Sequence, residues 1–339
     1  MTATVALRRA QRRRAVVAMA VLAVAAVALT ATDLLLGKAS LSPPEVVATI
    51  LGQGSAMSGF VVGELRLPRI LTALVVGASL GVSGAVFQTA LRNPLASPDI
   101  IGVTASASVA GIVSIVVFGL SGLALAAAVI AGALVAAAAM YLLAWRSGMD
   151  AYRLVLVGIG VAAICTGAIS FVLTRGNITD AQIALVWLTG SLNSSSWAAL
   201  VPVAICAAVI MVVIGALRRP LRLLELGDDP ASALGVPVER TRVAAVATAV
   251  ALAAVAVSTS GPLGFVALAS GQIARRLLST GSAGIAVSGF VGGVGLLAAD
   301  LVAQFAWQST ALPTGVVTGI VGAPFLIWLL VRASRSRGA

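Results

Sequence analysis

The most informative segment of the chain is residues 66–99, RLPRILTALVVGASLGVSGAVFQTALRNPLASPD. It opens on two arginines around a proline and continues as a long apolar run in which Gly77 and Gly81 stand four residues apart. Small residues at this spacing let helix backbones approach closely inside a bilayer. The segment ends in a polar, proline-containing turn at 92–99. We therefore expect a membrane-spanning helix with both ends marked by polar residues.

The composition of the whole chain indicates the same environment. Of its 339 residues, 60% are hydrophobic and 10% are charged, and the mean hydropathy is +1.10. Such a chain lacks the polar surface that a soluble globule of this size needs. We expect an all-α polytopic membrane protein with about ten transmembrane helices, the eighth of them short, because runs approaching the roughly 20 apolar residues of a spanning helix recur. These runs lie at 15–36, 66–90, 98–118, 122–145, 152–174, 198–217, 241–259, 265–279, 284–305 and 313–332.

The distribution of the arginines predicts the topology. An even number of spans puts both termini on one side, and a cytoplasmic basic segment at 1–14 then places 18 of the 22 basic residues on that side. This asymmetry follows the positive-inside rule. We therefore expect a multi-pass protein of the cytoplasmic (inner) membrane with cytoplasmic N- and C-termini. It would have one transmembrane domain over 15–332, a cytoplasmic loop at 218–240 and a cytoplasmic tail at 333–339.

The sequence lacks the residues that usually support catalysis or nucleotide binding. It has no histidine, the commonest general base and metal ligand. Its lysine, Lys38, lacks the glycine spacing of a Walker A loop, and Cys165 and Cys206 lack the spacing of a metal or redox site. We expect no catalytic residue, metal site or cofactor in this chain. Nucleic acid is not an expected partner either, because the arginines are scattered at helix ends.

Asp300 is an acidic residue well inside a predicted span, where a charge is costly and a functional role is the default hypothesis. One carboxylate supplies too few oxygens to hold a hard cation. Together with Gln88 and Asn93 it is a candidate residue of a transport pathway. A structural aspartate that hydrogen-bonds to a neighbouring helix is the alternative.

The longest predicted cytoplasmic segment contains a helix-forming pattern at 226–237, LGDDPASALGVP. Asp229 suits an N-cap, Pro230 suits the first helical position, and Gly235 suits the position just after the helix. We expect a short capped helix that presents small residues and one leucine to a partner protein. A plain surface loop is the alternative.

The chain resembles the FecCD family of permeases in several blocks that follow the family's order. The resemblance implies a permease subunit of a type II ATP-binding-cassette (ABC) importer, with ten helices in the fold shared with vitamin B12 permeases. Such a subunit is not an enzyme; it pairs with a second permease, two cytoplasmic ATPase subunits that bind ATP-Mg, and an extracytoplasmic binding protein. The blocks are 66–99, WLTGSL at 187–192, 226–237, GPLGFVAL at 261–268, IARR at 273–276, ADL at 299–301, LPTG at 312–315 and GAP at 322–324.

The resemblance also implies roles for particular residues. Arg66 and Arg69 match positions that pair with acidic groups of the binding protein, and arginines suit carboxylate recognition; anchoring at the membrane interface is the alternative. Asp150 and Tyr152 match the turn of an inner gate. The loop that would enter a cleft of the ATPase corresponds to Gly227, Asp228, Asp229, Ala231, Leu234 and Gly235.

Segments at 142–150 and 222–229, together with Gln304, are similar to the ferric enterobactin permeases within the family. This similarity favours a ferric siderophore as substrate and implies a heterodimer with a sister permease, a homodimer being the alternative. The chain departs from the family where Gly271-Gln272 replaces a Pro-His pair, so we expect the eighth helix to begin differently and to be more flexible. Gln304 stands where many members have an external arginine.

We therefore expect a permease subunit that moves a ferric siderophore into the cytoplasm and is energised by a separate ATPase. An ABC permease for haem or vitamin B12 is one alternative. An ion-coupled secondary transporter is another, and Asp300 is the mid-membrane ionisable residue that it would use.

Overall fold

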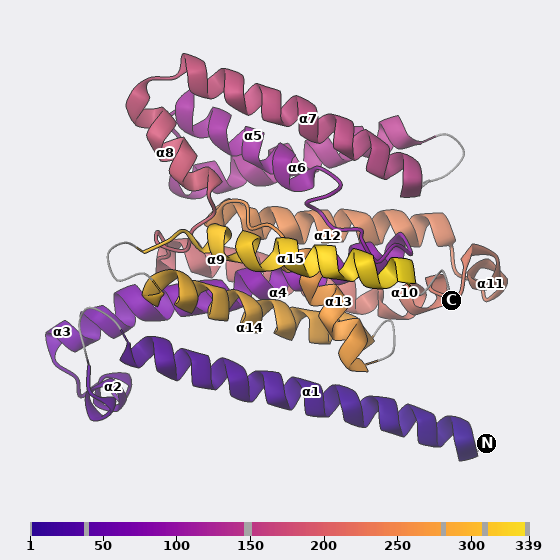
Figure 1. The fold of residues 1–339 in the computed structure, drawn as a ribbon, viewed down its shortest axis with the longest axis horizontal. Coiled ribbons are helices and arrows are strands. Elements are labelled where there is room, and N and C mark those ends of the chain that lie inside the picture. The colour runs from indigo at the N-terminus through magenta and orange to yellow at the C-terminus, as the bar shows by residue number, and fades with distance from the viewer. Residues whose placement is uncertain (1, 37–40, 146–150, 279–282, 307–310, 336–339) are drawn as a thin grey trace.

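A helix occupies every predicted span. The computed structural model describes residues 2–36, 41–145, 151–278, 283–306 and 311–335, and the regular elements in these ranges are helices (Figure 1). Ten of these helices overlap the ten predicted spans, although α1 begins at Thr2 and not at 15, and α5 begins at Val103 and not at 98. They are α1 Thr2–Leu35, α4 Leu67–Ala90, α5 Val103–Val116, α6 Gly122–Ala144, α7 Ala151–Arg175, α9 Trp197–Ala216, α12 Val238–Ser260, α13 Val266–Leu278, α14 Ala283–Phe305 and α15 Thr314–Arg335.

Seven helical stretches within the described ranges are long and apolar enough to cross a membrane. The predicted spans outside this group are shorter, namely α5, the apolar part of α15 at Thr314–Trp328, and α13. At 1.5 Å per residue α13 is about 20 Å long, against a hydrocarbon core of about 30 Å. The expectation that the eighth span is short is therefore confirmed. The seven stretches are Arg9–Leu35, Ala56–Ala90, Gly122–Ala144, Tyr152–Arg175, Trp197–Ala216, Val238–Ser260 and Gly284–Phe305.

Shorter helices join the long ones: α2 Pro43–Ile50, α3 Ala56–Gly59, the π-helical segment η1 Phe60–Arg66, α8 Ile178–Leu188, α10 Arg218–Leu224 and α11 Asp228–Ala233. Only α11 was predicted. Local capping explains two of the others, because the backbone N–H of Ser42 donates to Glu45 at 2.8 Å and that of Asp180 donates to the Asn177 side chain at 2.8 Å.

Helix α4 is the most buried of the candidate spans and packs against α12, α13 and α14. Its glycines make this packing possible. A Cβ atom at Gly77 would collide with the backbone carbonyl of Gly292 in α14, and one at Gly84 would collide with the carbonyl of Ala267 in α13. The prediction that small residues in 66–90 bring helix backbones together is confirmed.

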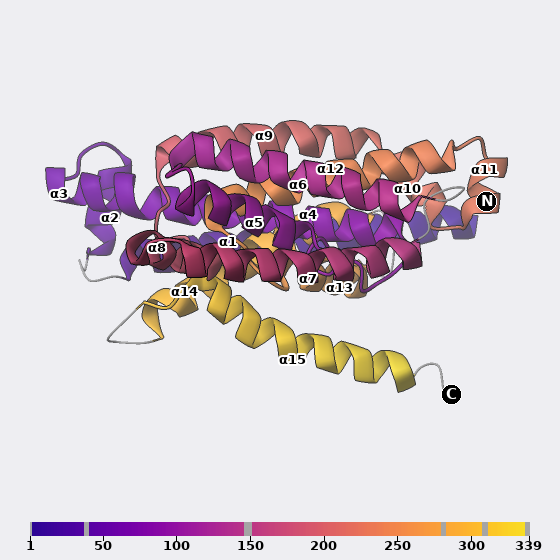
Figure 2. The same cartoon turned by 90° about the horizontal axis from the view of Figure 1, so that it is seen from above.

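The two ends of the helix bundle carry different elements (Figures 1 and 2). The start of α1, the end of α15, and α10 and α11 lie at one end, which we call the terminal end. Helices α2, α3 and α8 lie at the other, which we call the opposite end. Both described termini therefore share one end of the bundle, as an even number of crossings requires.

Candidate functional site

The predicted capped helix is present at the terminal end as α11, in a segment that we call the coupling segment, residues 218–240. The helix begins at Asp228 after Gly227, so the assignment of Asp229 as N-cap and Pro230 as first helical residue is wrong by about two positions. Gly235 has a φ of +80°, in the left-handed region. Its predicted place just after the helix is therefore confirmed.

The coupling segment is half buried and half exposed. Leu221, Leu224 and Ala231 are fully buried against the bundle, whereas Leu226 and Leu234 are about 60% exposed, at 61% and 60%. Two leucines, rather than the single one expected, are thus presented at this end. The buried residues fix the segment on the bundle, and the exposed ones leave an apolar surface for a contact.

An ionic cluster ties the start of α11 to the bundle. Asp228 accepts a bond from Arg242 of α12 at 2.6 Å and lies 3.0 Å from Arg92, which follows α4. Arg242 also donates to the carbonyl of Ala90 at 3.2 Å. The Arg242 side chain is 9% exposed, but those of Arg92 and Asp228 are 44% and 42% exposed. The cluster therefore connects α11 with α12 and with the end of α4 at an open surface.

A second polar chain links the coupling segment to α13. Thr89 of α4 donates to Glu225 at 3.4 Å and accepts from Arg275 of α13 at 3.2 Å. Burial raises the pKa of Glu225, while the charges of Arg275 and Arg222 and the Thr89 bond lower it. A displacement of the coupling segment would thus reach α4, α12 and α13 together.

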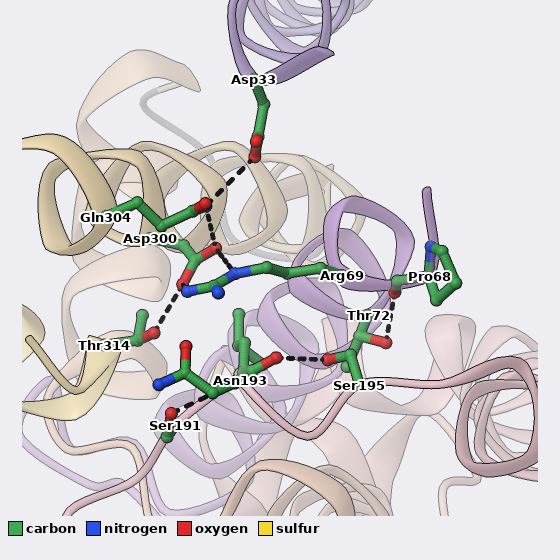
Figure 3. Close-up of polar contacts among 11 residues, drawn as sticks. Asp33, Pro68, Arg69, Thr72, Ser191, Asn193, Ser195, Asp300, Gln304 and Thr314 are labelled. Atoms are coloured by element: carbon green, nitrogen blue, oxygen red, sulfur yellow. Dashed lines mark hydrogen bonds and ion pairs between the residues drawn. The ribbon is translucent and has the colours of Figure 1, made fainter. Parts of the chain in front are cut away.

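A buried ion pair stands at the opposite end of the bundle (Figure 3). Arg69 of α4 donates to both carboxylate oxygens of Asp300 in α14, at 2.7 and 2.9 Å. Thr314 of α15 donates to Asp300 at 2.6 Å, and Gln304 donates to it at 2.9 Å. Gln304 also lies 3.4 Å from Asp33 of α1. Four helices, α1, α4, α14 and α15, are joined here, and the Asp300 side chain is 0% exposed.

This geometry supports the structural alternative for Asp300, a carboxylate bonded to neighbouring helices. Arg69 has a partner inside the chain and its side chain is 17% exposed, and Arg66 donates to the carbonyl of Leu34. The docking role of these two arginines stays a prediction. Residue 150 of the predicted gate lies outside the described residues, and Tyr152 is 73% exposed at the start of α7.

The pathway candidate Gln88 belongs to a buried amide cluster. Gln88 donates to the carbonyl of Leu268 in α13 at 3.1 Å, and Gln272 donates to Gln88 at 3.3 Å and to the carbonyl of Pro94. A Cβ atom at Gly271 would collide with the Gln88 amide. Asn93 accepts the backbone N–H of Leu95 at 2.9 Å and so shapes the turn after α4.

The replacement at 271–272 lies inside α13 and not at its start, so the expected effect on the beginning of the eighth helix is wrong. Gly271 gives room to Gln88, and Gln272 supplies a bond across to α4. The sequence marks this pair only as a departure from the family pattern. It does not indicate that Gln272, Arg242, Thr314 and Arg275 belong to these clusters.

The fold, with its long apolar helices joined at their ends by polar clusters, defines the class as a multi-pass helical membrane protein. The model of the FecCD transport family matches residues 19–332. The chain therefore belongs to the FecCD transport family.

Known proteins similar to the chain cover nearly all of it. The ferric enterobactin transport system permease protein FepG of Escherichia coli K12 is 41% identical over 301 residues, which are 89% of this chain and 91% of that protein. The achromobactin transport system permease protein CbrC of Dickeya dadantii is 39% identical over 300 residues, 88% of this chain and 86% of that one. A solved inward-facing structure, described as a metal-chelate type ABC transporter, has a TM-score of 0.84 and 28% identity, and covers 93% of this chain and 98% of its own.

Proposed function

We propose that this chain is the permease subunit of an ABC importer that carries ferric siderophores into the cytoplasm. The observation that carries the proposal is the 41% identity to a ferric enterobactin permease over 89% of the chain. A second relative of similar identity is named for another siderophore, achromobactin. In this assignment a partner ATPase binds and hydrolyses ATP-Mg, a second permease completes the pathway, and an extracytoplasmic protein delivers the chelate.

In this mechanism the coupling segment is cytoplasmic and meets the ATPase. Its exposed leucines, Leu226 and Leu234, offer the contact surface. Gly235 ends the short helix α11 just after Leu234 and leads the chain towards α12. The ion pairs of Asp228 and the Glu225 chain pass a displacement to α4, α12 and α13. Closure of the ATPase would therefore move α4, whose other end carries Arg69 of the Arg69–Asp300 pair.

Uptake by the reconstituted importer tests the substrate. The chain is assembled in proteoliposomes with its ATPase, its sister permease and its binding protein, and ⁵⁵Fe-labelled ferric enterobactin and ferric achromobactin are compared with haem and cyanocobalamin. We expect ATP-dependent accumulation of the ferric chelate alone. Accumulation of haem or cyanocobalamin in place of the ferric chelate would contradict the assignment of a ferric siderophore as the substrate.

The same vesicles separate an ABC importer from an ion-coupled carrier. Uptake that needs internal ATP and ignores an ionophore supports the importer. Uptake abolished by the ionophore and indifferent to ATP would instead support a secondary transporter.

A further inference from the structure

A large groove runs along the bundle from the terminal end, and the coupling segment contributes Arg218, Arg222, Glu225 and Leu226 to its lining. It has a volume of about 1510 Å³ and lies between α1, α4 and α14 on one side and α9 and α10 on the other. This exceeds the roughly 300–1,000 Å³ of typical small-molecule pockets. Small apolar residues line much of its length, among them Ala15, Ala23, Ala78 and Gly289.

The groove opens to the sides of the bundle, where lipid surrounds a membrane protein. Val16 of α1 and Phe290 of α14 both line it and are 54% and 43% exposed. The lining of α1 runs from Gln11 to Ala26, which at 1.5 Å per residue is roughly 22 Å. One leaflet of the hydrocarbon core is about 15 Å thick. The groove is therefore long enough for a headgroup and its acyl chains.

Its polar end is strongly basic. Arg12 of α1 and Arg218 and Arg222 of α10 line the groove, and Glu225 is the acidic residue among the lining side chains. Glu225 is paired within the protein, since Arg275 and Thr89 act on it, and Arg222 is shared between Glu225 and the groove. Three guanidinium groups at the mouth and an apolar floor match a ligand with an anionic head and long hydrocarbon tails.

We propose that this groove binds one anionic phospholipid, with its phosphate among Arg12, Arg218 and Arg222 and its acyl chains along α1, α4 and α14. The site requires only that the chain spans a membrane and is independent of the transported substrate. A lipid bound here would contact α10, the first helix of the coupling segment.

Lipid titration of the purified full chain followed by native mass spectrometry tests the headgroup site. The probe is dioleoyl phosphatidylglycerol, and dioleoyl phosphatidylcholine is the neutral comparison. We expect the triple variant Arg12→Gln, Arg218→Gln, Arg222→Gln to bind phosphatidylglycerol about 100-fold more weakly, because each arginine near a headgroup contributes on the order of a few-fold in affinity. Phosphatidylcholine binding should stay unchanged.

Neighbouring arginines provide the matched control. Arg13 and Arg219 are exposed and adjacent in sequence to the groove arginines but do not line it. The double variant Arg13→Gln, Arg219→Gln should bind phosphatidylglycerol like the natural chain. Equal losses in the two sets of variants, or no preference for phosphatidylglycerol, would overturn the site.

A second variant tests the apolar floor without altering charge. Ala23→Trp fills the groove, whereas Ala20→Trp changes an exposed residue of α1 that does not line it. We expect only Ala23→Trp to weaken phosphatidylglycerol binding. If Ala23→Trp has no effect, or if inorganic phosphate displaces the lipid from the natural chain, the groove holds a free anion and not a lipid.

Discussion

The two ends of the helix bundle are held by ionic clusters of opposite character. At the opposite end Asp300 is fully buried and makes two bonds to one arginine. At the terminal end Asp228 is 42% exposed and is shared by Arg92 and Arg242. Charge pairs are stronger and less adaptable when water is excluded. The first cluster is suited to fix four helices, and the second is suited to rearrange when a partner moves α11.

The largest expected effect on stability comes from removing the carboxylate of Asp300. Asp300→Ala leaves the Arg69 guanidinium without its carboxylate, and we expect a loss of about 3–5 kcal/mol in stability. Thermal unfolding of the purified chain in detergent measures it. The double variant Arg69→Met, Asp300→Leu removes both charges and should recover much of the loss. An unchanged unfolding temperature in Asp300→Ala would show that the pair does not hold the helices together.

Asp228 gives the matching measurement at the terminal end. Asp228→Ala should cost about 2 kcal/mol or less, because its partners regain water more easily than Arg69 does. Asp229→Ala is the control, since Asp229 is exposed and adjacent to Asp228. The difference between the two ends disappears if Asp228→Ala destabilises the chain as much as Asp300→Ala.

Two variants of Gly235 allow the effect on transport to be measured separately from the effect on stability. Gly235→Arg and Gly235→Ala share the same backbone cost of about 1–2 kcal/mol at a positive φ. No atom lies within 4 Å of a Cβ atom at this position, so a side chain begins in open space, and in the proposed complex the arginine would meet the ATPase. We expect uptake by the Arg variant to be about tenfold lower, which corresponds to about 1.4 kcal/mol, at equal unfolding temperatures. Equal uptake by the two variants would remove this loop from the proposed mechanism.

The smallest expected effect is the pH dependence of stability, which Glu225 and Glu45 change in opposite directions at the two ends. Burial raises the pKa of Glu225, so its contribution to stability is complete below its ordinary value of 4.5 and is lost as the pH rises through the raised pKa. Bonds from Ser42 lower the pKa of Glu45 in α2, so its contribution is present above 4.5 and is lost as the pH falls through the lowered pKa.

Unfolding temperatures of Glu225→Gln and Glu45→Gln, each compared with the natural chain from about pH 3 to 7, check these signs. We expect the advantage of the natural chain over Glu225→Gln to shrink as the pH rises and its advantage over Glu45→Gln to grow. Parallel slopes for the two variants would contradict the assignment of opposite shifts.

Hydropathy was enough to predict the helices because the bilayer imposes their length and composition. It could not predict α8 or α10, which are too short to give a span signal. The capping residues Asn177 and Ser42 were visible in the sequence and would have indicated α8 and α2.

Local sequence patterns could not predict which helices pack against one another. Asp300 stood out as a charge in an apolar run, but its partner Arg69 lies 231 residues away in sequence. The glycines of α4 predicted close packing but not which helix packs there, since any small-residue face would satisfy the spacing. Likewise, the resemblance assigned Arg69 an external role and gave no sign of its bond to α14.

The missing side chain at Gly271 has a consequence for protein engineering. The Gln88 amide fills the space that a methyl group at 271 would need, and the two residues come from different helices. Placing the Pro-His pair that the resemblance implies for the family onto positions 271–272 would therefore displace the Gln88 amide and disturb its bonds to Leu268 and Gln272. A segment exchange that includes α13 of this chain therefore has to be designed together with position 88 of α4.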